Sequence, residues 1–113
     1  MIESGLKVET VVDGAGVATL RMSGNVDGGG DEVLAGAYAT AAAASASSVV
    51  LDFAAVHYIN STGIALIVRL LADARRDHRE VIASGLSEHY REIFRLTRLS
   101  DFMTITDPAP AAG

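Results

Sequence analysis

Two hydrophobic periodicities divide the chain into expected strands and helices. Residues 6–12 (LKVETVV) and 17–23 (VATLRMS) alternate between two faces, which is typical of half-buried strands. The turn-forming stretch 13–16 (DGAG) between them predicts a β-hairpin. Apolar runs predict three further strands, and apolar residues at helical spacing predict three helices. We expect these strands at 49–53, 81–84 and 102–106, a loop at 54–58, and helices at 31–44, from just after 61–62 to 74, and at 88–99.

The order of these elements predicts the fold class. After the hairpin, helices and strands alternate, and strands joined through helices pair in parallel by right-handed crossovers. We therefore expect an α/β fold with a mixed, mostly parallel β-sheet that has an N-terminal β-hairpin and is covered by helices. A chain of 113 residues suits one domain, which we assign to residues 1–107. Residues 108–113 (PAPAAG) have nothing to bury, so we expect a disordered C-terminal tail.

A hydroxyl pair stands where the central strand leads into the long helix. Ser61 and Thr62 precede the apolar spacing of that helix, which is the place of an N-cap. A phosphate on Ser61 would meet the positive end of the helix dipole and free backbone N–H groups. Two interpretations follow: Ser61 caps the helix and does nothing else, or a partner kinase phosphorylates it.

The helix that follows has one apolar side and one mixed side. Leu66 falls on the mixed side, among Arg69, Asp73 and Asp77. It is either an ordinary exposed leucine or an anchor for a partner one turn from Ser61. The residues expected to face the core are Ile64, Ile67, Val68, Leu71 and Ala74.

The composition of the chain argues against several classes of function. The net charge is −5, which argues against a general nucleic-acid binder. The absence of cysteine excludes disulfides and thiolate metal sites. The first residues, 1–9, lack the features of an export signal, and no apolar run approaches the roughly 20 residues that span a bilayer. We therefore expect a cytoplasmic protein that binds neither nucleic acid nor membranes.

No constellation in the sequence predicts catalysis. Ser61, His57 and Asp27 or Asp52 could form a nucleophilic set on paper, but the G-x-S-x-G elbow is missing. The histidines have no metal-ligand spacing, so we expect neither a metal nor another cofactor. The glycines at 28–30 fit no phosphate-binding pattern and suit a turn. The protein is expected not to be an enzyme.

Three segments together resemble the STAS domain, the sulphate transporter and anti-sigma factor antagonist domain. The central segment 49–66, with its phrase LDFAAVHYINSTGIAL, is similar to the family signature of an apolar strand, a short loop and Asp-Ser-Ser/Thr-Gly-Ile/Leu. Residues 22–27 (MSGNVD) resemble the end of the family's second strand. Residues 84–87 (SGLS), with the apolar positions up to Leu99, resemble its last helix region. The resemblance covers roughly residues 5–107.

The resemblance implies a function like that of the stand-alone bacterial anti-anti-sigma factors. Such proteins bind an anti-sigma factor with serine kinase activity and thereby free a sigma factor. The kinase phosphorylates the serine of the motif, here Ser61, the antagonist is released, and a serine phosphatase resets the switch. Asp27 matches a family acidic residue that contributes to partner recognition. The partner-binding residues expected on this basis are Asp27, Asn60, Ser61, Thr62, Gly63 and Leu66.

One residue departs from the family pattern. Asn60 stands where the family usually has aspartate before the serine, so a kinase that relies on this carboxylate would lose a charge-assisted contact. Two alternatives therefore accompany the antagonist hypothesis. The first is an unswitched STAS scaffold or assembly subunit, and the second is a small-ligand or nucleotide-binding regulator that uses the glycine-rich loop after Asp27.

Overall fold

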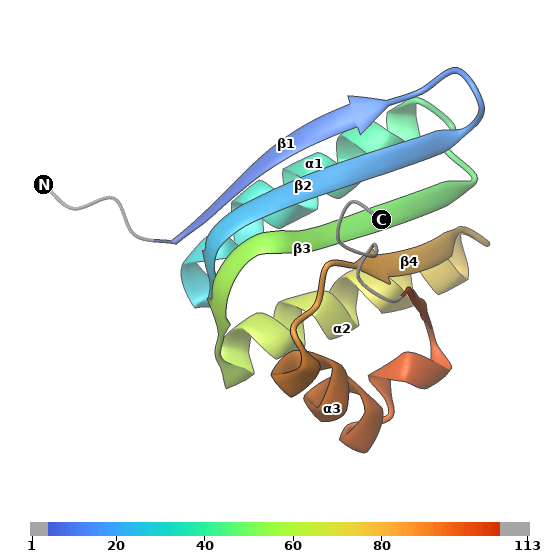
Figure 1. Ribbon diagram of the computed structural model, residues 1–113. Helices are drawn as coiled ribbons and strands as arrows, with labels where there is room; N and C mark the ends of the chain where they lie inside the picture. The colour runs from blue at the N-terminus through green and yellow to red at the C-terminus, as the bar shows by residue number, and fades with distance from the viewer. Residues whose placement is uncertain (1–4, 107–113) are drawn as a thin grey trace, which may run out of the picture.

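The computed structural model describes residues 5–106, so the tail expected at 108–113 lies outside the described residues. One five-stranded sheet carries three helices and two 3-10 turns (Figure 1). The elements are β1 (Leu6–Val12), β2 (Val17–Val26), η1 (Gly28–Gly30), α1 (Asp31–Ala43), β3 (Ser48–Ile59), α2 (Ser61–Arg76), β4 (Glu80–Ser84), α3 (Glu88–Leu96), η2 (Leu99–Asp101) and β5 (Thr104–Ile105).

The strands lie in the order in which the chain makes them, β1-β2-β3-β4-β5. The hairpin partners β1 and β2 are antiparallel, and β2 to β5 are parallel neighbours. This arrangement confirms the expected α/β fold with a mixed, mostly parallel sheet. Each crossover moves to the next strand in the same direction, so right-handed connections place successive helices on the same face of the sheet.

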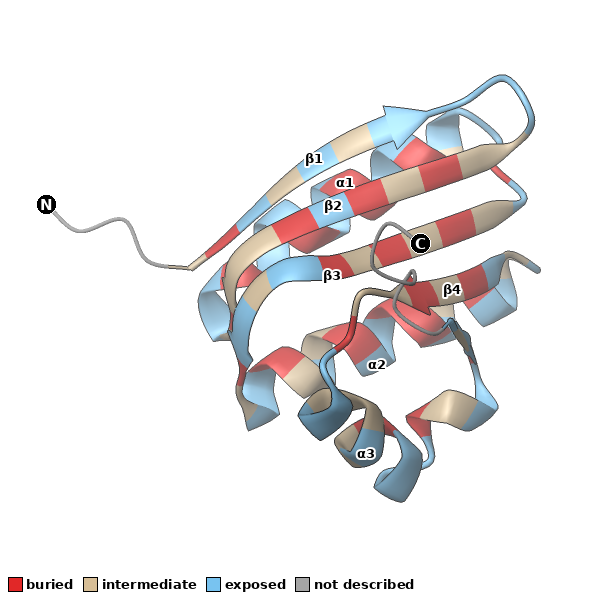
Figure 2. Cartoon of the chain, in the orientation of Figure 1, coloured by how far each residue is buried: buried red, intermediate tan, exposed pale blue. Residues whose placement is uncertain are grey.

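Burial along the strands agrees with this one-sided covering (Figure 2). Leu20 of β2 and Leu51 of β3 are register partners that face the helices, and both are fully buried. Their chain neighbours Thr19 and Val50 pair on the opposite face and are half-buried. Phe94 of α3 joins the helix-side core, where its ring meets Phe53 edge to face with centroids 5.8 Å apart. The helices cover one face of the sheet, and the other carries polar and β-branched side chains.

The central strand is longer than its apolar run predicts. The loop expected at 54–58 is extended backbone, and β3 continues to Ile59. Pairing with β4 ends at Asp52, so β2 holds the second half of β3, with two shifts in register. The segment from Ala54 to Tyr58 has no fully buried side chain, which is why its pattern resembled a loop. This extension carries the start of α2 beyond the end of β4.

The third helix is shorter than expected. It ends at Leu96, three residues before the expected end at Leu99, because Arg98 adopts a left-handed conformation with φ 67°. A left-handed residue just past the last turn stops a helix. The remaining residues form the turn η2, and the last strand shrinks to Thr104–Ile105.

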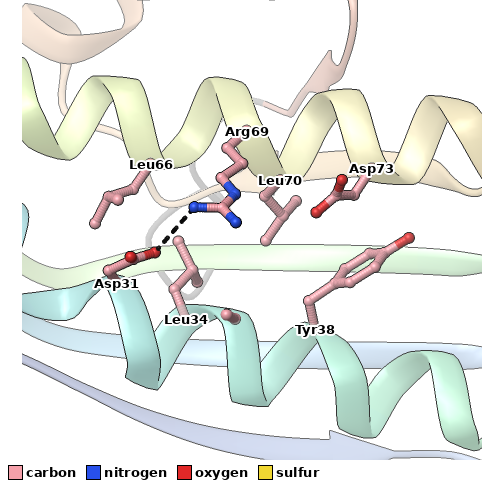
Figure 3. Close-up of a pocket in the computed structure, with 8 residues that line it drawn as sticks. Asp31, Leu34, Tyr38, Leu66, Arg69, Leu70 and Asp73 are labelled. Carbon is pink, nitrogen blue, oxygen red and sulfur yellow. Dashed lines mark ion pairs between the residues drawn. The ribbon is translucent and has the colours of Figure 1, made fainter.

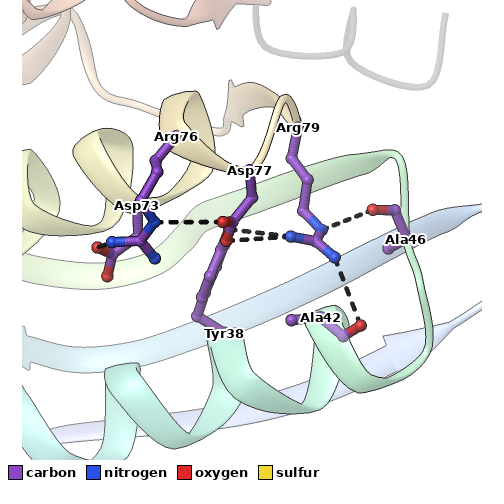
Figure 4. Close-up of polar contacts among 7 residues, drawn as sticks. All are labelled: Tyr38, Ala42, Ala46, Asp73, Arg76, Asp77 and Arg79. Atoms are coloured by element: carbon purple, nitrogen blue, oxygen red, sulfur yellow. Dashed lines mark hydrogen bonds and ion pairs between the residues drawn. The ribbon is translucent and has the colours of Figure 1, made fainter.

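A polar cluster ties the end of α1 to the connection between α2 and β4 (Figure 4). The guanidinium of Arg79 donates from Nε to the Ala46 carbonyl at 2.8 Å and from Nη2 to the Ala42 carbonyl at 3.4 Å. Its Nη1 lies 3.2 Å from Oδ2 of Asp77, which also accepts a hydrogen bond from the Tyr38 hydroxyl at 2.8 Å. A cation at the carbonyl end of α1 is electrostatically favourable.

The same contacts shift the pKa values of two side chains, Asp77 and Tyr38. The hydrogen bond from Tyr38, together with the nearby guanidinium groups of Arg76 and Arg79, holds the pKa of Asp77 below its usual value. Burial, followed by the hydrogen bond to Asp77, raises the pKa of Tyr38. The shared hydrogen bond stabilises the ionised form of Asp77 and the protonated form of Tyr38, so it moves the two pKa values in opposite directions.

We expect Tyr38→Phe to lower the thermal unfolding midpoint by about 4 °C at pH 7, because its hydrogen bond to Asp77 and the longer one that it accepts from Arg79 are both lost. The pKa of Asp77 is depressed in the folded state, so this interaction stabilises the fold above the unfolded pKa of about 3.9. It is lost as pH falls through the lower folded value. The difference between the thermal melts of the two proteins should be constant from about pH 5 to pH 8 and should shrink progressively as the pH falls below about 4. A constant difference down to the lowest pH would contradict this account.

Candidate functional site

The candidate site lies where β2 and β3 end side by side. These strands are parallel, so their carboxyl ends meet at one edge, with Val26 paired to Ile59. The residue after β2 is Asp27, and the residue after β3 is Asn60, whose backbone N–H donates to the Val26 carbonyl at 3.2 Å. Two loops that are 33 positions apart in the sequence therefore form one corner with Ser61 at the start of α2.

Asn60, not Ser61 or Thr62, is the N-cap of α2. Its extended backbone precedes the helix, and its side-chain Oδ1 accepts a hydrogen bond from the backbone N–H of Gly63 at 2.8 Å. The interpretation of Ser61 or Thr62 as the cap is therefore wrong, because the cap is the residue just before Ser61. Asn and Ser cap about equally well, so the local pattern did not distinguish them.

Because Asn60 takes the capping role, the Ser61 side chain is left free. Ser61 is the first residue of α2 and is exposed. Its hydroxyl makes no hydrogen bond to any residue between 5 and 106 that the structure describes. The hydroxyl thus lies in solvent at the positive end of a 16-residue helix.

Two glycines allow the corner to close. A Cβ on Gly63 would lie 1.9 Å from the Val26 carbonyl oxygen, so only glycine lets α2 begin this close to the end of β2. A Cβ on Gly28 would lie 2.9 Å from Cγ2 of Thr62, so the turn η1 packs against the first turn of α2. The glycines of the Asp27 loop serve close packing at this point.

Asp27 is half-buried beside this contact. Its Oδ1 accepts from the backbone N–H of Gly29 at 3.0 Å and caps the turn η1. The carboxylate is thereby held at the corner that also contains Ser61 and Thr62. A fixed carboxylate next to an exposed hydroxyl can bind a donor from a second protein.

Leu66 lies on the side of α2 that faces α1. It is half-buried, packs against the core and lines a groove between the two helices. The expectation for Val68 is wrong: this residue is 45% exposed, and Leu70 is buried in its place. The buried side chains of α2 therefore lie partly on a different side of the helix from the one predicted. The reason is that α1 packs against the side that the sequence pattern assigned to solvent.

The described residues show no alternative chemical site around His57. His57 is exposed, and Asp52, five residues earlier on the extended strand β3, uses Oδ1 to accept from the backbone N–H of Ala54 at 2.9 Å. Among residues 5–106, no group of three histidine, aspartate or glutamate side chains could hold a metal ion. Within the same range, no helix is both long and apolar enough to cross a membrane.

Comparison with known proteins assigns the family. The family model described as "Mlab, STAS domain" matches residues 10–106, which is most of the chain. The chain belongs to the STAS domain family. The resemblance found in the sequence is confirmed at this level.

Solved structures with the same STAS fold include several antagonists of anti-sigma factors. The anti-sigma factor antagonist SpoIIAA in its unphosphorylated form is 14% identical, with 91% of this chain and 90% of that one covered and a TM-score of 0.71. An antagonist from Mycobacterium paratuberculosis is 23% identical (88% and 84% covered, TM-score 0.67). A putative antagonist from Thermotoga maritima is 16% identical (95% and 90% covered, TM-score 0.69). These similarities show that this chain and the three proteins share a fold.

Two aromatic residues of this STAS domain adjoin the corner, and sequence reasoning missed both. The hydroxyl of Tyr90 on α3 accepts a hydrogen bond from the backbone N–H of Ile59 at 2.9 Å, which fixes the end of β3 one residue before Asn60. The spacing of α3 indicated only that Tyr90 faces the core, because its partner lies 31 residues earlier. Tyr58 is 54% exposed directly before the corner, inside the segment predicted to be a loop.

We expect Asn60→Ala to destabilise this STAS domain by about 1 kcal/mol, because the Gly63 N–H loses its cap. Asn60→Asp should be as stable as the wild type or slightly more stable, since aspartate also caps and its charge suits the helix N-terminus. Urea denaturation of the three proteins measures the difference. Equal stability of wild type and Asn60→Ala would show that the cap contributes nothing.

Gly63→Ala should destabilise the fold by about 3 kcal/mol, because its Cβ would overlap the Val26 carbonyl. Gly36 provides the matched control within α1, where an added Cβ has nothing within 4 Å. Gly36→Ala should stabilise the fold by about 1 kcal/mol through helix propensity. Denaturation curves that shift the same way for both variants would refute the close approach at Gly63.

Proposed function

We propose that this STAS domain is an anti-sigma factor antagonist whose partner is an anti-sigma factor with serine kinase activity, and that phosphorylation of Ser61 ends the binding. The observation that carries the proposal is the free, exposed hydroxyl of Ser61 at the start of α2. A capping serine would have its oxygen engaged, whereas this one is open to a second protein.

The electrostatics of the corner support a phosphate switch. A phosphoserine carries about −1.5 to −2 charges at pH 7, and the N-terminus of α2 stabilises negative charge within the chain. The folded domain therefore tolerates the phosphate. A partner packed against the corner meets added bulk and charge, with the Asp27 carboxylate already at the same edge. Phosphorylation thus weakens binding without unfolding the protein.

The behaviour of a structural neighbour agrees with a tolerated phosphate. SpoIIAA has been solved in a phosphorylated form and in an unphosphorylated form, and this chain matches each with a TM-score of 0.71. The fold of that protein is thus similar to this chain in both forms. In this chain, the proposed partner-binding surface consists of Asp27, Asn60, Ser61, Thr62, Gly63 and Leu66.

The second candidate is an unswitched scaffold, and Asn60 favours it. Asn60 uses its Oδ1 on the cap of α2 and presents a neutral amide, where aspartate would present a carboxylate. A kinase that needs a negative charge beside the serine finds none on Asn60. In that case the domain binds its partner constitutively and Ser61 stays unmodified.

We expect the cognate serine-kinase anti-sigma factor with ATP to add one phosphoryl group to the protein, as measured by intact mass. Ser61→Ala should abolish the addition. Ser87→Ala is the matched control, because Ser87 also starts a helix but its hydroxyl caps Tyr90 of α3. This control should still be phosphorylated, and a serine phosphatase should remove the group. Tight binding without phosphorylation would favour the scaffold.

Titration of the variants tests the electrostatic step separately. Ser61→Ala should bind the anti-sigma factor as the wild type does, and Ser61→Asp should bind at least about tenfold more weakly, which corresponds to about 1.4 kcal/mol. Both variants keep the Asn60 cap, so thermal melts should show equal folding. Equal affinities of the two variants would remove the charge-based switch.

A further inference from the structure

A small groove lies between α1 and α2 (Figure 3). Its cavity volume is about 80 Å³. Leu34 from α1 and Leu66 and Leu70 from α2 form its apolar wall. Leu66 is one of the proposed partner-binding residues and lines the groove, so the groove adjoins the proposed partner-binding surface.

The groove exists because α1 presents a small side chain at this point. Ala35 is exposed and lines the groove with only a methyl group. Tyr38 and Asp73 lie toward the opposite end of the groove from Leu66 (Figure 3). Tyr38 is held there by its hydrogen bond to Asp77. The cavity is therefore open toward solvent beside Ala35 and bounded by fixed groups at its far end.

The rim near the corner is acidic and holds a weak ion pair. Asp31 and Glu32 occupy the first turn of α1, and Asp27 precedes them as the N-cap of the turn η1. Arg69 lies with Nη1 3.8 Å from Oδ1 of Asp31, and the two side chains are 71% and 52% exposed. Such an exposed pair contributes little, so a cation of another protein can replace Arg69 beside Asp31.

The volume and charge of the groove select its occupant. Sites for small organic ligands usually have about 300–1,000 Å³, far more than this groove offers. A second copy docked symmetrically would bring the acidic rim against itself. A single aliphatic side chain can pack against the apolar wall, and a basic residue next to it can pair with the acidic rim.

We propose that the groove receives one aliphatic side chain of the protein that docks at Ser61, with an adjacent Lys or Arg that pairs with Asp31. This inference rests on the proposed function for the identity of the partner. The chemistry of the groove itself can be tested without that partner. It requires both the apolar wall at Leu66 and the carboxylate at Asp31.

The first test titrates the ¹⁵N-labelled protein with acetyl-Lys-Leu-amide and follows amide chemical shifts. We expect shifts confined to residues around Leu66, Leu70 and Ala35, with a dissociation constant on the order of 10 mM for one buried side chain and one rim charge. Acetyl-Lys-Gly-amide should cause no such shifts. Acetyl-Glu-Leu-amide should bind about threefold more weakly, because an exposed charge pair is replaced by an exposed repulsion.

A matched pair of variants shows whether the groove is the site. Ala35→Leu fills the cavity from α1 and should abolish the shifts caused by acetyl-Lys-Leu-amide. Ala39→Leu makes the same change one turn later at an exposed position outside the groove and should bind as the wild type does. No groove-specific shifts in the wild type, or equal binding by both variants, would overturn the proposal. Equal binding of the Lys and Glu peptides would overturn its charged part.

The same variants separate this inference from the proposed function. Ala35→Leu should weaken binding of the anti-sigma factor kinase at least tenfold, and Ala39→Leu should not. If the kinase phosphorylates Ser61 but binds both variants equally, the groove proposal fails and the proposed function stands. If the peptide binds the groove but no kinase modifies Ser61, the proposed function fails alone. A concentration-dependent dimer of the wild type that Ala35→Leu abolishes would assign the groove to a second copy and overturn the proposal.

Discussion

The close approach of α2 to the end of β2 is the constraint on which the site depends. The missing side chain of Gly63 lets the helix start against the Val26 carbonyl, since a Cβ there would lie 1.9 Å from that oxygen. The Asn60 backbone bonds to the same carbonyl, and its side chain caps the helix. With the strand end, the cap and the helix start held together, the next side chain is left outside the network. That side chain is Ser61.

The one-sided topology of the sheet explains why the corner is accessible. Consecutive parallel strands with right-handed crossovers place the helices on one face. Because β2 and β3 are parallel neighbours, the loops after them meet at the carboxyl-terminal end of the sheet. The turn η1 packs its Gly28 against Thr62, and Tyr90 of α3 fixes the backbone of Ile59. The corner is rigid in its backbone and open in its side chains, which suits recognition by a second protein.

The two ends of α2 have opposite roles. At its C-terminal end, Asp77 and the nearby Arg79 join Tyr38 and the carbonyls of Ala42 and Ala46, at and just after the end of α1, in a closed polar cluster. At its N-terminal end, Ser61 is unbonded among the described residues and the Arg69–Asp31 pair is exposed. The groove between α1 and α2 connects these ends. The closed end thus fixes α2 against α1, whereas the backbone contacts of Asn60 and Gly63 hold the other end and leave its exposed side chains to the proposed partner.

The amino-acid sequence by itself determined the order of the elements, the fold class and the place of Ser61 between a strand and a helix. These features follow from periodicity and turn residues, which act over a few neighbouring positions. Only the tertiary structure decided that Asn60 caps α2, that β3 reaches Ile59 and that Leu66 faces α1. Each of these depends on residues far away in the chain. Packing against Val26, pairing with the end of β2 and contact with α1 select among local alternatives of similar energy.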